Sequence, residues 1–205
     1  MLLELQYLEL FFKLHRGRMF FVNQRLKVIP DNIATPEAFA ALSPQVRLRV
    51  RDAFLENLDL IESFVAENLA QFSEEELEIV RSWRHVVHGK FYVFRELAKY
   101  TVFLSTTDPT VAYGVLALSQ PFEELIGPYL PVMVETVLLP FKEIIAYDGL
   151  MSSFNISFGP GIRRRLNESF KEAKGRHGIV TSLPMSNVPM GRKSPKAKSM
   201  LPGAK

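Results

Sequence analysis

The chain has 205 residues, of which 47% are hydrophobic and 23% charged; this composition excludes intrinsically disordered, collagen-like and disulfide-rich proteins. It contains no cysteine, which excludes thiol catalysis, iron–sulfur clusters and cysteine-based zinc sites and favours a reducing compartment. The first residues lack a basic leader and a signal cleavage site, and no uncharged apolar run approaches the roughly 18 residues of a membrane span. We therefore expect a cytoplasmic protein with no membrane partner.

The positive charge of the chain gathers at its C-terminal end. The formal net charge is +3, yet residues 183–205 hold five basic residues and no acid, which leaves 20 basic and 22 acidic residues before them. Because this end is also rich in proline, glycine and serine, residues 184–205 are predicted to form a disordered basic tail. Such a tail either binds phosphates in a salt-sensitive way or serves as a solubilising extension.

The chain opens with apolar residues at helical spacing, which predict a helix over residues 2–26. This helix is apolar nearly all round, so it must be buried on more than one side, within the fold or at a homodimer interface. Gly17 is a possible break, and residues 19–29 fit a short strand equally well. The spacing rests on Leu3, Tyr7, Leu10, Phe11 and Leu14.

Three helix starts follow, each marked by a residue that can cap the first turn. Thr35 and Ser43 each precede a proline, and Ser73 lies three residues before Glu76 in the pattern of a capping box. These starts predict helices over residues 37–42, 43–71 and 74–87.

Strand-forming residues take over at Gly89, and short apolar runs are separated by turn signals. Residues 143–147 are predicted to form a strand closed by a turn at Asp148 and Gly149, with a last strand over residues 154–158. A helix over residues 162–174 then closes the module. The predicted class is α+β: a helical region over 1–88 and a mostly antiparallel sheet module with a closing C-terminal helix over 89–183.

His85 and His88 form one candidate site. A spacing of three residues on a helix would place both imidazoles on one face, where they could ligate a metal ion. No HExxH pattern supplies further ligands. The alternative is that both histidines lie near a helix C-terminus and complement its dipole.

A second candidate site is the predicted helix start at Gly159 and Gly161. The glycines allow backbone N–H groups to approach an anion, and the partial positive charge of the helix start attracts it. Three arginines follow directly, at Arg163, Arg164 and Arg165. The alternative is a strand-to-helix turn whose arginines pair with acids one helical turn away.

Four acids could serve acid–base chemistry: Glu123, Glu124, Glu135 and Asp148. Glu135 interrupts an apolar run, so its side chain lies either on the solvent side of a strand or buried with a shifted pKa. No GxSxG pattern is present, so serine-hydrolase chemistry has no support.

A set of short runs in the second half of the chain resembles an uncharacterised family of bacterial proteins. The resemblance covers residues 89–183 and implies a shared sheet-and-helix module, without an activity, cofactor or partner. The runs are Leu138-Leu139-Pro140-Phe141-Lys142, Ile145, Tyr147-Asp148-Gly149, Phe158-Gly159, Gly161-Ile162-Arg163-Arg164, Leu166-Asn167-Glu168 and Gly178-Ile179-Val180-Thr181-Ser182-Leu183.

These patterns favour a non-enzymatic binding or scaffolding protein, without a cofactor, that contacts a protein partner or a second copy of itself. The first alternative is a nucleic-acid-associated protein that uses the helix start at residues 159–165 and the basic tail. The second alternative is a metal-dependent hydrolase that uses His85, His88 and an acid.

Overall fold

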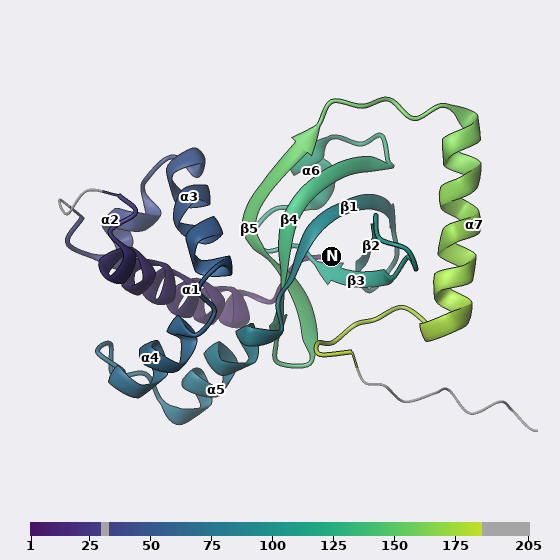
Figure 1. The fold of residues 1–205 in the computed structure, drawn as a ribbon. Helices are drawn as coiled ribbons and strands as arrows, with labels where there is room; N and C mark the ends of the chain where they lie inside the picture. The colour runs from purple at the N-terminus through teal and green to yellow at the C-terminus, as the bar shows by residue number, and fades with distance from the viewer. Residues whose placement is uncertain (30–32, 186–205) are drawn as a thin grey trace, which may run out of the picture.

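The computed structural model describes residues 1–29 and 33–185, in which a group of helices precedes a small β-barrel (Figure 1). This order confirms the α+β class predicted from the sequence. The elements of the first part are α1 (Leu5–Leu26), α2 (Pro36–Ala40), α3 (Pro44–Leu55), α4 (Leu60–Glu67), α5 (Glu74–Ser82) and the 3-10 turn η1 (Trp83–His85).

Helix α1 runs without interruption through Gly17, so the possible break and the alternative strand over residues 19–29 are both wrong. Gly17 instead permits a close packing contact, since a Cβ atom there would lie 3.0 Å from Cζ of Phe72. Phe11 and Leu14 are fully buried. Most apolar residues of α1 pack within the same chain, in one core shared with the other helices and the barrel, whereas Leu5 is 72% exposed.

The single helix predicted over residues 43–71 is wrong, because the chain divides it into α3 and α4. The amide of Asn57 donates a hydrogen bond to the carbonyl of Ala53 at 2.8 Å. Its side chain thereby takes the acceptor that its own backbone N–H would use in a continuing helix. Asn68 ends α4 in the left-handed region, and its side chain bonds the backbone of Phe72.

The strands of the described chain form a closed barrel in the order β1-β2-β3-β5-β4. Four neighbouring pairs are antiparallel and one, β3 with β5, is parallel, which confirms the mostly antiparallel sheet. Helix α6 (Phe122–Ile126) connects β3 to β4. The strands are β1 (Val87–Glu96), β2 (Thr101–Ser105), β3 (Ala112–Leu116), β4 (Val132–Phe141) and β5 (Ile144–Phe154).

Strand β5 continues through Asp148 and Gly149, where the sequence predicted a turn, and residues 155–158 form no further strand. The register of β4 and β5 shifts at this point: Leu138 faces Tyr147, but Thr136 faces Met151. The extra residues form a β-bulge. Gly149 has a φ of 79°, a conformation that suits glycine, so the Asp-Gly pair bends a strand without ending it.

We expect Gly149→Ala to lower the free energy of unfolding by about 1–2 kcal/mol, because a side chain in the left-handed region is strained. Urea denaturation measures this loss. Gly89→Ala in β1 is the matched control, since its Cβ would meet nothing within 4 Å and its φ is not positive. An equal effect of both substitutions would contradict the assigned bulge.

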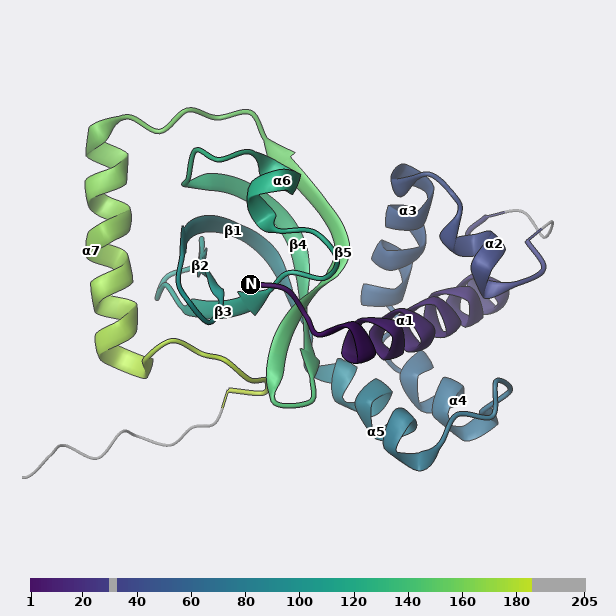
Figure 2. The ribbon, with the colours of Figure 1, turned by 180° about the vertical axis from the view of Figure 1, so that it is seen from behind.

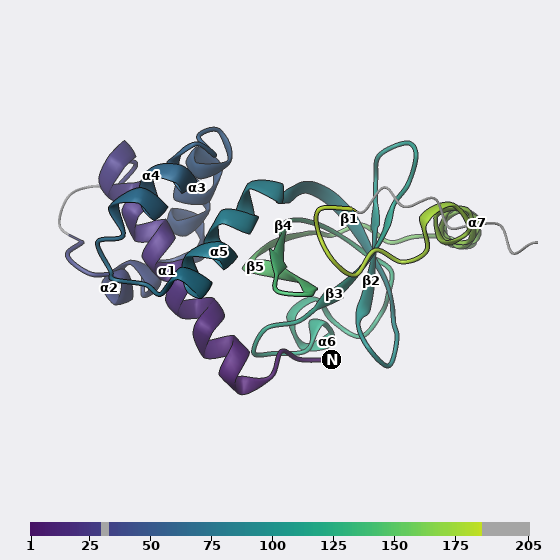
Figure 3. The same ribbon diagram turned by 90° about the horizontal axis from the view of Figure 1, so that it is seen from below.

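Helix α7 (Pro160–His177) packs on the barrel on the side away from the N-terminal helices (Figures 1 and 3), which confirms the closing helix. After it, the N–H and C=O of Val180 bond to Ala112 and Gly114 of β3, each at 2.8 Å. Of the predicted tail, residues 186–205 lie outside the described chain. A small separate core joins α7 to the barrel through Phe94, Val102, Leu104, Ala112, Leu166, Phe170 and Ala173.

Trp83 connects the helices to the barrel, whose strands begin immediately after η1 (Figure 2). Its side chain is fully buried, and its Nε1–H donates a hydrogen bond to the carbonyl of Pro140 in β4 at 2.9 Å. Its ring lies 6.2 Å from that of Phe11, which packs edge-on against Phe141 of β4 at 5.4 Å. Aromatic packing therefore fixes where α1 and η1 meet the barrel.

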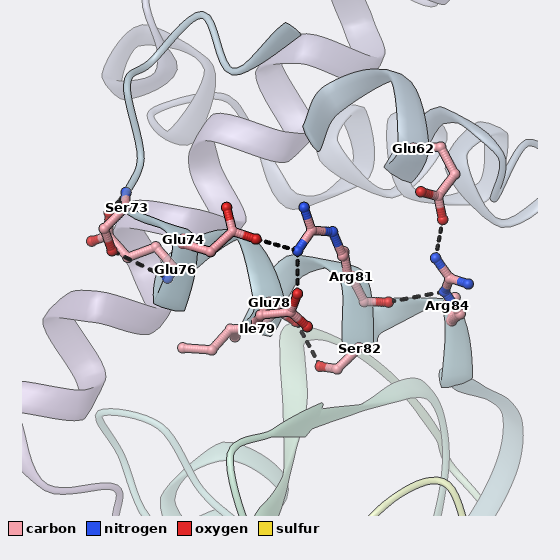
Figure 4. A network of polar contacts seen from close by, with 9 residues as sticks. All are labelled: Glu62, Ser73, Glu74, Glu76, Glu78, Ile79, Arg81, Ser82 and Arg84. Carbon is pink, nitrogen blue, oxygen red and sulfur yellow. Dashed lines mark hydrogen bonds and ion pairs between the residues drawn. The ribbon is translucent and has the colours of Figure 1, made fainter. Parts of the chain in front are cut away.

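Polar contacts within α5 and one ion pair between η1 and α4 form a network on the surface of the helical part (Figure 4). Ser73 and Glu76 form the predicted capping box. Arg81 pairs with Glu74 at 2.6 Å and also with Glu78, and Arg84 of η1 pairs with Glu62 of α4. These side chains are largely exposed, so solvent screens the pairs and they contribute little to stability. None of the helices described is both long and apolar enough to cross a membrane.

Candidate functional site

A cavity of about 300 Å³ lies where the N-terminal helices meet the barrel. Its walls come from α1, α2 and α3 on one side and from α6, β5 and the residues after β3 on the other. The site therefore exists only when the two halves of the chain are packed together. The lining residues are Phe12, His15, Arg16, Met19, Phe39, Ala40, Arg47, Leu118, Ser119, Gln120, Leu125, Tyr147, Asp148, Gly149 and Leu150.

Helix α1 contributes one stripe of four side chains to this cavity, Phe12, His15, Arg16 and Met19. Their spacing of three and four residues places them on the same helical face. His15 stacks on Phe11 with ring centroids 5.5 Å apart, and Arg16 lies over the ring of Phe12 at 5.0 Å. The stripe thus combines apolar surface with two nitrogen-bearing side chains.

The bulge of β5 places Asp148 in the wall of the cavity, where this residue is 3% exposed. Its Oδ1 accepts a hydrogen bond from the backbone N–H of Leu150 at 3.0 Å, and the hydroxyl of Thr136 lies 3.5 Å away. Its Oδ2 is buried and receives no hydrogen bond from the residues described. The bulge therefore fixes the carboxylate by one oxygen and leaves the other available.

Buried guanidinium groups surround this carboxylate. Nη1 of Arg51 lies 4.0 Å from Oδ2 of Asp148, while its Nε and Nη2 donate to Asp52 on the outer side. Arg18, 1% exposed, lies over the rings of Phe54 and Trp83 at 4.1 and 4.8 Å.

Five buried nitrogens in this region find no hydrogen-bond partner in the described chain. They are Nε and Nη1 of Arg18, Nη1 of Arg51, Nε of Arg47 and Nε2 of His15. Arg47 and His15 line the cavity themselves, and His15 is only 9% exposed. Buried polar groups are normally hydrogen-bonded, so the two unpartnered nitrogens in its wall make this cavity a candidate binding site.

Burial controls the protonation of the cluster. Desolvation raises the pKa of Asp148 to about 6, although Arg51, the Leu150 N–H, Arg18 and Thr136 oppose the shift. Desolvation lowers the pKa of Arg18 to about 9, and Asp148 partly offsets it. The pKa of His15 falls well below its usual value through burial and then through Arg18, Arg47 and Arg16. At neutral pH, His15 is uncharged and cationic groups outnumber the buried carboxylate.

The arginines predicted to hold an anion lie elsewhere, on α7, none of whose residues lines the cavity; this helix packs on the side of the barrel away from the N-terminal helices (Figure 3). Arg163 donates to the carbonyls of Phe158 and Leu130 at 3.0 and 2.8 Å, and Arg164 pairs with Glu168 at 3.2 Å. Arg165 is exposed beside a shallow groove. Gly159 is the N-cap residue of α7, and Gly161 lies in its first turn.

His85 and His88 occupy different elements, the first in η1 and the second in β1. The shared helical face does not form, because α5 ends at Ser82 and the strand begins at Val87. Nε2 of His88 lies 3.6 Å from Oε1 of Glu135 on the neighbouring strand, and both side chains are partly exposed. Within residues 1–29 and 33–185, no three histidine or acidic side chains are placed to hold a metal ion.

Sequence reasoning missed the arginines and the histidine of the cavity region. A signal was present in α1, where Arg18 stands four residues from both Leu14 and Val22, on the buried face of the helix. A cation at a buried helical position needs a partner or a function. Asp148 was considered only among four acids, because its Asp-Gly sequence is typical of a turn.

Comparisons with known proteins add no assignment to this site: no family model, no curated protein and no solved structure matches the chain.

Proposed function

We propose that the protein is a non-enzymatic binding protein whose ligand is a small molecule with a negatively charged group, held in the cavity between the helices and the barrel. The observation that carries this proposal is the unpartnered state of Nε of Arg47 and Nε2 of His15 in the cavity wall, with Arg18 buried nearby. Leaving a buried donor without an acceptor costs free energy, and a charge-assisted hydrogen bond to an anion removes that cost.

Binding is favoured over catalysis by the hydroxyl groups of the cavity. Among the described lining residues, neither Ser119 nor Tyr147 is hydrogen-bonded to an imidazole or carboxylate that could activate it. Burial raises the pKa of Tyr147 to about 12, so this hydroxyl stays protonated.

We expect Arg47→Met to weaken the binding of small anions about 10- to 100-fold, the range for loss of a hydrogen bond to a charged group. Isothermal titration of the full chain with acetate, benzoate and inorganic phosphate measures this effect. Arg164→Met is the control, because Arg164 is exposed on α7 and pairs only with Glu168 among the described residues. Equal weakening by both variants would contradict a site at the cavity.

Two features predicted from the sequence belong to the same proposal: a cytoplasmic location, supported by the absence of cysteine, and self-association. Sedimentation of the untagged protein tests the second, since a homodimer has twice the 23.4 kDa mass of the chain.

We do not propose nucleic-acid binding or metal-dependent hydrolysis, because Arg163 and Arg164 bond within the chain and His85 and His88 occupy different elements.

A further inference from the structure

The cavity has a volume of about 300 Å³ and is partly open to solvent. This volume is at the lower end of the range of small-molecule sites. Acids of the size of hexanoate or benzoate fit within it.

The walls of the cavity are largely apolar away from its charged groups. A ligand that carried only charge would leave this surface without a partner, whereas a hydrocarbon body would cover it. The apolar side chains are Phe12, Met19, Phe39, Leu118, Leu125 and Leu150.

The charges of the cavity favour a single negative charge. Asp148 already occupies one wall with an ionised carboxylate at neutral pH, and Asp52 engages two nitrogens of Arg51 from outside. Asp148 repels any anion in the cavity, while Arg47 and Arg16 attract it; because the cost of desolvating an ion grows faster with its charge than this attraction does, a monoanion is favoured over a dianion. A planar carboxylate also matches the geometry of a guanidinium group.

We infer that the ligand is a small monocarboxylic acid with an apolar body, whose carboxylate binds at Arg47 and whose hydrocarbon part lies against Phe39, Leu118 and Leu125. This inference rests on the proposed function and adds the chemical class of the ligand.

The cavity has a neighbour that limits the length of the hydrocarbon part. A groove lined by Pro36, Ala70 and Phe72 shares the side chains of Phe12 and Arg16 with the cavity. The contact between these two side chains separates the two spaces. Affinity therefore rises with chain length only while the acid fits on the inner side of this pair.

The test is isothermal titration of the full chain at pH 7 with acetate, butyrate, hexanoate, benzoate, hexan-1-ol, inorganic phosphate and ADP. Each buried methylene group strengthens binding up to about fourfold, so hexanoate is expected to bind at least about tenfold more tightly than acetate. Hexan-1-ol, which lacks the charge, is expected to bind at least about tenfold more weakly than hexanoate.

A pair of matched variants separates the apolar wall from the charged one. Leu125 lines the cavity and is 40% exposed, so Leu125→Ser leaves the buried core intact; Leu97→Ser is the control, since Leu97 is 39% exposed and lies outside the cavity. Leu125→Ser is expected to weaken hexanoate binding about threefold or more and to leave acetate binding unchanged.

The outcomes distinguish this inference from the function on which it rests. If neither the carboxylates nor phosphate bind, both the proposed function and the inference are overturned. If phosphate or ADP binds more tightly than hexanoate, or if acetate and hexanoate bind equally, the anion site stands and the monocarboxylic acid is wrong.

Discussion

Replacement of Arg18 by methionine is expected to raise the free energy of unfolding at pH 7 by about 1–2 kcal/mol, although it removes a buried side chain from the centre of the molecule. Arg18 makes no hydrogen bond to the described chain through Nε or Nη1. Its aliphatic part and flat head pack between Phe54 and Trp83, contacts that methionine largely reproduces. The substitution thus keeps the packing and removes the cost of a desolvated charge.

Removal of one member of a buried ion pair is usually destabilising, because the remaining charge is left alone. Asp148 is not left alone in this variant, since Arg51 and the N–H of Leu150 remain beside it. The gain is therefore expected to be small and positive. Urea denaturation of the wild type and of Arg18→Met at pH 7 measures it, with Arg165→Met on α7 as the control for loss of an exposed arginine, where the change stays within about 0.5 kcal/mol.

The pH dependence supplies an independent check on the same variant. Burial lowers the pKa of Arg18 to about 9 in the folded chain, whereas the unfolded chain keeps the higher, ordinary value. Above pH 9 the unfolded state therefore binds more protons, so the contribution of Arg18 makes the wild type more stable as pH rises. The advantage of Arg18→Met is expected to shrink by about 1 kcal/mol between pH 8 and pH 10.

Two results would show that Arg18 stabilises the fold as a cation. One is a difference in unfolding free energy between the two proteins that stays constant from pH 8 to pH 10. The other is a loss of more than about 2 kcal/mol of unfolding free energy in the variant at pH 7. The expected result instead assigns Arg18 a cost in stability.

The features predicted correctly from the sequence are those set by neighbouring residues. Ser73 and Glu76 form their capping box, and Thr35 accepts a hydrogen bond from the backbone of Ala38 at the start of α2, because a cap involves only one turn of helix. The transition from helices to strands was placed close to Val87, where β1 begins. Side-chain chemistry changes there within a few residues.

The features missed depend on contacts between distant parts of the chain. A parallel pairing of Val115 with Ile145 closes the barrel, and no local pattern indicates it. The Asp-Gly pair of β5 is typical of a turn, and only its pairing with β4 makes it a bulge. The candidate site was missed for the same reason, since His15, Arg47 and Asp148 come from three elements that meet only in the folded molecule.

Trp83 is the residue whose loss is expected to destabilise the protein most. Trp83→Ala is predicted to lower the free energy of unfolding by about 3–5 kcal/mol, because it leaves a cavity between α1 and the barrel. Trp83→Phe keeps part of the ring but leaves the buried carbonyl of Pro140 without its hydrogen bond, which costs about 1–3 kcal/mol. Urea denaturation with a probe of the barrel, such as near-ultraviolet circular dichroism of the tyrosines, measures both values.

Trp83 and Arg18 touch, so their substitutions should not be additive. The guanidinium carbon of Arg18 lies 4.8 Å from the indole ring centroid, a cation–π contact worth about 0.5–2 kcal/mol when desolvated. In a cycle of Trp83→Phe, Arg18→Met and the double variant, we expect a coupling energy up to this range, because Trp83→Phe weakens and Arg18→Met removes the same contact. If the changes in unfolding free energy are additive, Trp83 and Arg18 do not stabilise each other. Trp83 would then contribute only through its contacts with the barrel, and Phe54 and Asp148 would hold Arg18 in place.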